Sequence, residues 1–298
     1  MAGIERDGIG FVGLGVMGEP MCRNLARKSG RTVYGFDRDA APMQRLADHG
    51  VIAASGLQDL AERCEVIFLS LPSAEHLKSV CEGPAGLIAQ MQAGQILVDT
   101  STSPVELTRT FGAALAAKGI GFADAPIART RQAAEEGTLA ITVGADDETF
   151  AAVAPLLAHC GSDITHCGPI GSGQVVKLLN NMVLIETVVA LSEALAIGRA
   201  AGVNGHLLFD ALSKGSADSF ALRNHGIKAV LPDIFPERAF STTYARKDLD
   251  YALALARHVG IAAKGAELAD GLLLRAVERG HGDRYWPVLS RVIGDVDG

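Results

Sequence analysis

Short apolar runs alternate with stretches of helical periodicity through the first half of the chain. The runs are rich in Val, Ile, Leu and Phe, and we expect strands at 8–12, 32–36, 66–69, 95–99, 121–125 and 139–143. Strands that alternate with helices are typical of a parallel sheet, because each helix returns the chain to the start of the next strand. The pattern therefore predicts an α/β fold for this half.

The strand pattern stops at the glycine-rich segment 168–173. Residues 174–201 are predicted to form one long helix, and Gly202 stands where a helix end favours glycine. Apolar residues occupy much of this helix's circumference, so we expect other helices or a second subunit to cover it. We predict a first domain at 1–167 and an all-α domain at 168–298, with the long helix spanning about 171–202.

The first predicted strand runs directly into Gly13-Leu14-Gly15-Val16-Met17-Gly18. In a strand–turn–helix unit the first glycine permits the turn, the second lets the backbone approach a pyrophosphate, and the third allows close packing. The phosphates would lie on free N–H groups at the helix N-terminus. Asp37 ends the next strand 19 residues after Gly18, where an acid can bind a ribose. We interpret the motif as a dinucleotide site; the alternative is a structural glycine-rich turn.

Asp37 and its neighbour Arg38 bear on which dinucleotide binds. A carboxylate accepts hydrogen bonds from ribose hydroxyls and repels a 2′-phosphate, which favours NAD. Arg38 would attract that phosphate, so NADP is the alternative.

Composition narrows the class of protein. The 298 residues suffice for two domains, and a net charge of −7 offers no basic footprint for nucleic acid. The N-terminus is polar, so we expect no signal peptide. No uninterrupted apolar stretch is long enough to span a bilayer, so we expect no membrane partner. Five cysteines without a CxxC pair indicate reduced thiols and a cytoplasmic protein. The histidines lack ligand spacing such as HxxxH, so we expect no metal.

Lys177 and Asn181 lie four residues apart in the long helix and so share a face. Their neighbours are apolar, and a buried cation is costly unless it faces a polar cleft. One interpretation is structural, with the lysine reaching solvent or closing an ion pair. The other is functional: the lysine faces a bound nicotinamide and transfers a proton, while Asn181 holds a substrate oxygen.

Four segments, in order along the chain, resemble motifs of the 3-hydroxyacid dehydrogenase family. They are the cofactor signature at 13–21, the substrate loop from Asp124-Ala125-Pro126 through Gly137-Thr138-Leu139, the catalytic helix at 171–181 and the cofactor contact Lys247-Asp248-Leu249. The resemblance implies a Rossmann-like, doubly wound sheet followed by an all-helical domain. It also implies homodimers or homotetramers formed through the helical domain.

Residue by residue, the resemblance assigns Lys177 as the proton donor and acceptor and Asn181 as a substrate ligand. Thr102 matches the family's hydroxyl at the nicotinamide side of the cofactor. Lys247 matches a cofactor-contacting lysine, for which a solvated surface lysine is the alternative. The dipeptide Leu71-Pro72 is expected to line the path of the nicotinamide ribose.

The chain departs from the family at its substrate loop. Most members carry Ser-Gly-Gly after the position of Ile127, whereas this sequence reads Ala128-Arg129-Thr130-Arg131. A guanidinium offers a planar fork of donors to an oxyanion. We therefore predict a small anionic substrate gripped by Arg129 with help from Thr130, and expect Arg131 at the surface. A solvent-facing Arg129 is the alternative.

The predicted activity is hydride transfer between a nicotinamide cofactor and a short 3-hydroxy acid or semialdehyde with an anionic end group. The Arg-Thr pair and segment 280–286 resemble the sulfolactaldehyde reductase branch of the family, so sulfolactaldehyde and succinic semialdehyde are alternative substrates. An imine reductase is disfavoured by Lys177, and a 6-phosphogluconate dehydrogenase by the short chain. From another class, a non-catalytic dinucleotide-binding module is the rival.

Overall fold

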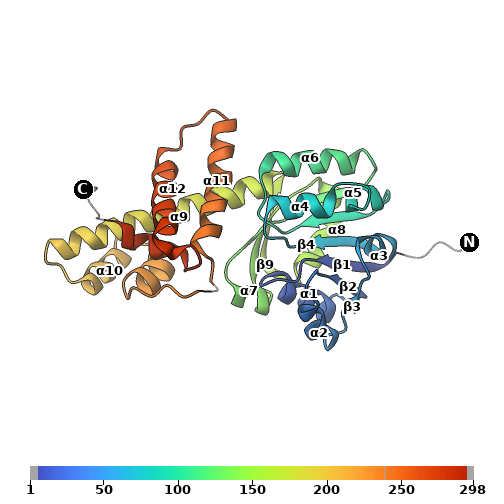
Figure 1. The fold of residues 1–298 in the computed structure, drawn as a ribbon, viewed down its shortest axis with the longest axis horizontal. Helices are drawn as coiled ribbons and strands as arrows, with labels where there is room; N and C mark the ends of the chain where they lie inside the picture. The colour runs from blue at the N-terminus through green and yellow to red at the C-terminus, as the bar shows by residue number, and fades with distance from the viewer. Residues whose placement is uncertain (1–5, 238, 294–298) are drawn as a thin grey trace, which may run out of the picture. The chain divides into compact units, whose positions relative to one another are not determined.

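The computed structural model describes residues 6–237 and 239–293. The chain divides into two compact units, residues 1–177 and 178–298 (Figure 1). Unit 1 is an α/β unit and unit 2 is built from helices. The predicted α/β class with a helical second part is confirmed.

The described residues of unit 1 form a nine-stranded sheet with strand order β3-β2-β1-β4-β5-β6-β8-β7, and β9 pairs with β8. Its strands are β1 (Gly8–Val12), β2 (Val33–Phe36), β3 (Ile52–Ala53), β4 (Cys64–Leu69), β5 (Ile96–Asp99), β6 (Gly121–Asp124), β7 (Ile127–Ala128), β8 (Leu139–Gly144) and β9 (Gly161–Gly168). Strands β1 to β6 pair in parallel in the doubly wound order, which reverses direction between β1 and β4.

Helices cover both faces of this sheet. They are α1 (Gly18–Lys28), α2 (Ala40–Ala47), α3 (Leu57–Arg63), α4 (Ala74–Cys81), α5 (Leu87–Gln90), α6 (Val105–Ala116), α7 (Arg131–Glu136) and α8 (Asp147–Leu157). Figure 1 shows α4, α5 and α6 on one side of the strands and α1 and α2 on the other. Alternate side chains of β4 enter the two cores, with Phe68 in one and Ile67 in the other. Burial on both faces explains the continuous apolar runs of the central strands.

Three strands were not predicted from the sequence. β9 is an edge strand with mostly exposed or partly exposed residues, so its sequence GSDITHCG carries no apolar run. β3 and β7 are only two residues long, which is too short to show an alternation of apolar and polar residues. The six predicted strands are present with boundaries within two residues.

Helix α9 (Ser172–Ala200) begins in unit 1, and most of its residues belong to unit 2. Unit 2 also contains α10 (Gly205–Ser213), the π-helix η1 (Leu222–Val230), α11 (Thr242–His258), α12 (Lys264–Ala276), the short π-helix η2 (Val277–His281) and the 3-10 helix η3 (Trp286–Val292). Leu191, Leu249, Leu272 and Trp286 belong to its core. Within the described chain, α9 is also the one helix long and apolar enough to cross a membrane. Since the core helix of a globular protein passes the same test, this carries little weight.

Hydrogen bonds to a buried carboxylate hold the start of α9 in place. Asp124, at the end of β6 and with no exposed surface, accepts hydrogen bonds from the backbone N–H groups of Gly171 (2.6 Å) and Gln174 (2.8 Å). These donors belong to the helix N-terminus, where N–H groups lack partners within the helix. Burial is the largest effect on this carboxyl and, with the neighbouring carboxylate of Asp99, raises its pKa to about 6, although both backbone donors oppose the change.

This raised pKa predicts a pH-dependent contribution to stability. Since the folded pKa lies above the unfolded value, the contribution of Asp124 is fully present below about pH 4 and is lost as pH rises through about 6. The difference in unfolding free energy between wild type and Asp124→Asn should therefore fall by about 2 kcal/mol from pH 4.5 to 7.5. Urea unfolding followed by circular dichroism measures it.

Trp286, the single tryptophan, lies in the core of unit 2 and supplies the internal control. The unfolding transition of unit 2, followed by Trp286 fluorescence, should depend on pH in the same way in wild type and in Asp124→Asn. A stability difference that is flat across this pH range would contradict the expected titration.

Candidate functional site

The glycine-rich loop lies at the point where the strand order of unit 1 reverses. It follows β1, and the neighbouring strand β4 leads into Ser70 and Leu71. Ligands of doubly wound sheets bind at the carboxyl ends of strands beside such a reversal. The backbone N–H of Leu14 donates to Oδ2 of Asp37 at 2.5 Å, and that of Asp39 donates to Oδ1 at 2.8 Å. The two sequence-predicted parts of the dinucleotide site are thus joined.

The three glycines of the loop are required for different reasons. A Cβ on Gly13 would lie 2.3 Å from the carbonyl oxygen of Ser70, and one on Gly18 would lie 1.9 Å from that of Gly13. Protein packing therefore excludes a side chain at both positions. A Cβ on Gly15 would meet no protein atom within 4 Å. The space in front of Gly15 is open, which fits a backbone that must approach a pyrophosphate closely.

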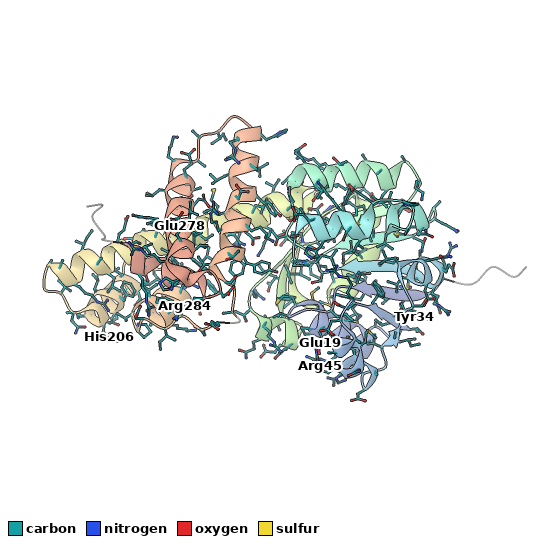
Figure 2. All side chains as sticks on the ribbon, in the orientation of Figure 1. Glu19, Tyr34, Arg45, His206, Glu278 and Arg284 are labelled. Atoms are coloured by element: carbon teal, nitrogen blue, oxygen red, sulfur yellow. The ribbon has the colours of Figure 1, made fainter. Side chains whose placement is uncertain are left out.

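The helix that follows the loop is anchored to the next helix. Glu19, in the first turn of α1, accepts two hydrogen bonds from the guanidinium of Arg45 on α2, at 2.8 and 2.7 Å, and Figure 2 shows the two side chains together. The Arg45 guanidinium holds the pKa of Glu19 below its usual value. Val16, in the loop, is 59% exposed, and Arg38 is exposed as well. Residues 13–18, 37 and 38 thus form one partly open surface.

A second group of candidates surrounds the turn after β5. Ser101 accepts a hydrogen bond from the N–H of Leu71 through its Oγ at 2.9 Å. The carboxylate of Asp99 accepts from the N–H of Ser101 (2.9 Å) and from Oγ of Ser103 (3.2 Å). Thr102 lies between these two serines and is partly exposed. The structure therefore brings the predicted Leu71 and Thr102 to neighbouring loops at the carboxyl edge of the sheet.

Lys177 lies on α9, in the turn after Gln174, and is partly exposed. The side chain of Gln174 has no exposed surface; its Nε2 donates to the carbonyl of Ser101 at 2.8 Å, and its Oε1 accepts from the N–H of Ser103 at 3.1 Å. The helix that carries Lys177 is thus bonded directly to the turn that carries Thr102.

Asn181 and Lys247 lie in unit 2, where Asp248 links them. Asn181 is 5% exposed, and its Nδ2 donates to Oδ2 of Asp248 at 2.8 Å. The ammonium of Lys247 lies 3.3 Å from Oδ1 of the same carboxylate. The rings of Tyr244 and Tyr251 flank that ammonium, with centroids at 5.3 and 5.4 Å. Asp248 is 3% exposed, so its carboxylate is buried, whereas Tyr244 is 44% exposed and lies at the surface side of this polar cluster.

The substrate-loop candidates have structural partners of their own. Arg129 adopts a φ of +86°, and its guanidinium donates to the carbonyl of Thr138 (2.6 Å) and to Ser162 (2.9 Å) and pairs with Asp163 (2.7 Å). Thr130 is the N-cap of α7, since its Oγ1 accepts from the N–H of Ala133.

Arg131, the neighbour that we expected at the surface, is exposed. It pairs with Glu135 one turn along α7, at 2.9 Å.

Sequence reasoning assigned no role to Asp124, Gln174 or Asp248, although all three stand inside the motifs it used. The feature that could have identified them is a polar side chain within an apolar segment. Asp124 ends an apolar strand, and Gln174 stands one turn before Lys177. Within the described residues, no three His, Cys, Asp or Glu side chains gather as metal ligands would.

The open space at Gly15 predicts that substitution there affects ligand binding more than stability. Gly15→Ala should change the unfolding free energy by less than about 1 kcal/mol, because no protein atom is displaced. It should weaken dinucleotide binding by about tenfold or more, because a methyl group would stand against the phosphates. Fluorescence titration with NADH and thermal unfolding measure the two effects.

Gly18→Ala is the matched comparison, since its methyl group collides with backbone. It should lower stability by more than about 2 kcal/mol. Equal stability losses in the two variants would contradict this division of roles.

Two family models match the chain. One describes the NAD binding domain of 6-phosphogluconate dehydrogenase and matches residues 8–168. The other describes the NAD-binding region of NADP-dependent 3-hydroxyisobutyrate dehydrogenase and matches residues 171–286. Together they account for both units.

Individual relatives agree with these models. The chain is 36% identical to 2-(hydroxymethyl)glutarate dehydrogenase of Eubacterium barkeri, over 82% of this chain and 81% of the relative. It is 35% identical to 3-hydroxyisobutyrate dehydrogenase of Pseudomonas aeruginosa, over 84% and 86%. The solved structure of Mycobacterium tuberculosis 3-hydroxyisobutyrate dehydrogenase with L-serine has a TM-score of 0.88 and 28% identity, covering 97% of this chain and 99% of that one. The chain therefore belongs to the 3-hydroxyacid dehydrogenase family of NAD(P)-dependent oxidoreductases.

Proposed function

We propose that this protein interconverts a short 3-hydroxy acid and the corresponding semialdehyde, with Lys177 as proton donor and acceptor. The observation that carries the proposal is the direct bonding of the Lys177 helix, through Gln174, to the 101–103 turn beside the dinucleotide loop. When bound, the nicotinamide supplies or takes up the hydride. The loop at residues 13–18 would hold its pyrophosphate, with Asp37 at the ribose and Thr102 and Leu71-Pro72 at the nicotinamide end.

Lys177 performs the proton transfer in this mechanism. In the reduction direction its ammonium donates a proton to the carbonyl oxygen, and in oxidation the neutral amine takes the hydroxyl proton. Asn181 lies one turn further along α9 and on the same side, so its amide can hold the same oxygen. Lys247, held beside Asp248, is proposed as a further cofactor contact.

Arg129 is proposed as the anchor of the substrate's anionic end. Its guanidinium already forms an ion pair with Asp163, which is 59% exposed, and an incoming acid group would compete with that carboxylate. Both carboxylate and sulfonate oxygens suit this donor geometry. We propose 3-hydroxyisobutyrate or tartronate semialdehyde as substrate types, with sulfolactaldehyde or succinic semialdehyde as alternatives.

Other features support further parts of the proposal. Asp37 favours NAD over NADP, since its carboxylate would face a 2′-phosphate. Apolar side chains of unit 2 that are exposed in the single chain, including Val183, Leu207 and Phe220, support a homodimer or homotetramer through the helical unit. The five cysteines form no disulfide, which supports a cytoplasmic location.

An activity screen with a lysine variant tests the proposed reaction. Wild type should oxidise NADH with at least one of succinic, tartronic and methylmalonic semialdehydes and sulfolactaldehyde, with NADPH run in parallel. Lys177→Ala should lose about 10²- to 10⁴-fold in kcat, the usual contribution of general acid–base catalysis. Its affinity for NADH should stay within about threefold, because the pyrophosphate is bound by backbone N–H groups.

Lys214→Ala is the control, because Lys214 is a surface lysine of unit 2 paired only within its own helix turn. It should match wild type in turnover. Tight NADH binding without turnover of any substrate would favour the non-catalytic module, and wild-type turnover by Lys177→Ala would refute the proposed acid.

Removal of the Arg129 guanidinium should affect substrate binding selectively. Alanine retains a Cβ, so Arg129→Ala leaves the energetic cost of the positive φ unchanged. The substitution removes only the charged hydrogen-bond donors. Its KM for the acidic substrate should rise by about 10- to 100-fold, as expected for a lost charge-assisted hydrogen bond. The KM for the methyl ester of the same substrate should change far less.

Arg131→Ala removes the same side chain two residues away, where it pairs with Glu135. Steady-state kinetics should show no change in KM for this control. If both variants behave alike, or if the ester and the acid are affected equally, Arg129 is a surface charge.

A further inference from the structure

The side chain of Gln174 closes both ends of the turn that carries Thr102. Its Nε2 donates to the carbonyl of Ser101 at 2.8 Å, and its Oε1 accepts from the N–H of Ser103 at 3.1 Å. A primary amide offers a donor and an acceptor at once, because its nitrogen and its oxygen are bonded to the same carbon. Since Gln174 has no exposed surface, water cannot replace these bonds without opening the structure.

The backbone of Gln174 is held as firmly as its side chain. Its N–H donates to Asp124 at 2.8 Å, and the carbonyl of the preceding Gly173 accepts from Oγ1 of Thr142 at 3.0 Å. Strands β5, β6 and β8 are thus all bonded, directly or through the turn that follows, to one turn of α9. This turn has little freedom to rotate or slide.

Lys177 follows Gln174 by three residues, so the two side chains leave α9 on the same side. A helix turns by a fixed angle per residue, and the rotation fixed at Gln174 therefore sets the direction in which the Lys177 side chain leaves the helix. We infer that Gln174 is a positioning residue, which aligns Lys177 with the turn at 101–103 and so governs proton transfer rather than ligand affinity. The inference rests on the proposed role of Lys177.

Gln174→Met removes both hydrogen bonds at nearly constant volume. A misplacement of about 1 Å can cost on the order of 10²-fold in rate, so kcat should fall by about 10- to 100-fold while NADH affinity stays within about threefold. In a Lys177→Ala background the same substitution should change the residual rate by less than about twofold, because the residue it positions is gone. A full loss in both backgrounds would overturn the inference.

Gln95→Met is a matched control from the same unit. Gln95 is 2% exposed, and its Nε2 donates to the carbonyls of Ala61 and Cys64, at 2.9 and 2.6 Å, at the opposite end of β5. Gln95→Met should lose about as much stability as Gln174→Met, while its kcat should stay within about twofold of wild type. Equal losses of kcat in both glutamine variants would show that a general destabilisation, and not positioning, is responsible.

Hydrogen exchange of the cofactor-free protein provides a readout that needs no activity. Amides of 175–178 should exchange faster in Gln174→Met than in wild type, and remain unchanged in Gln95→Met. Unaltered protection of 175–178 overturns the inference even if the enzyme proves active. If wild type turns over no semialdehyde, the proposed function fails, while the exchange result still decides whether Gln174 holds the helix. Gln174→Asn, which is shorter by one methylene, replaces the methionine variant if the latter does not fold.

Discussion

Two N–H groups at the end of a helix converge on one buried carboxylate, Asp124, and the candidate chemistry depends on that contact. The approach is close enough to require two glycines. A Cβ on Gly144 would lie 2.4 Å from Oδ1 of Asp124, and one on Gly173 would lie 2.4 Å from the carbonyl of Thr142. The helix can therefore start directly on the strands, and its first turn is fixed before Lys177 is reached. Burying the carboxylate raises its pKa to about 6, which indicates that this precision is gained at some expense of stability near neutral pH.

The elements that could be predicted from the sequence are those with a regular pattern of apolar residues within one segment of the chain. Central strands such as β1 and β4 are apolar on both faces, and α9 is a long helix with a glycine after it, so pattern alone located them. Strand β9 was missed because an edge strand with exposed side chains has no such pattern. The roles of Asp124 and Gln174 could not be predicted, because each depends on partners 47 to 73 residues away in the chain.

The substrate loop carries an arginine at a backbone position that suits glycine. Arg129 holds a φ of +86°, a conformation that glycine adopts freely and other residues adopt at a cost of order 1 kcal/mol. Bonds from its guanidinium to Thr138, Ser162 and Asp163 offset that cost. The guanidinium is thus pre-oriented by an exposed carboxylate, and an acid group that displaces Asp163 would meet donors already in place. The proposed preference for an anionic substrate over a neutral one rests on this arrangement.

Asn181 is oriented by its partner in a way that agrees with its proposed role. Because Asp248 accepts from Nδ2, and Oδ1 of Asn181 accepts from the neighbouring Asn180 at 3.2 Å, the second N–H of the Asn181 amide remains as a donor. A donor at this position would stabilise a carbonyl oxygen that gains negative charge during reduction. In the proposed mechanism Lys177, one turn earlier on α9, supplies the proton to that same oxygen. The buried carboxylate of Asp248 thus determines which N–H of the buried Asn181 amide remains for the substrate oxygen in the proposed mechanism.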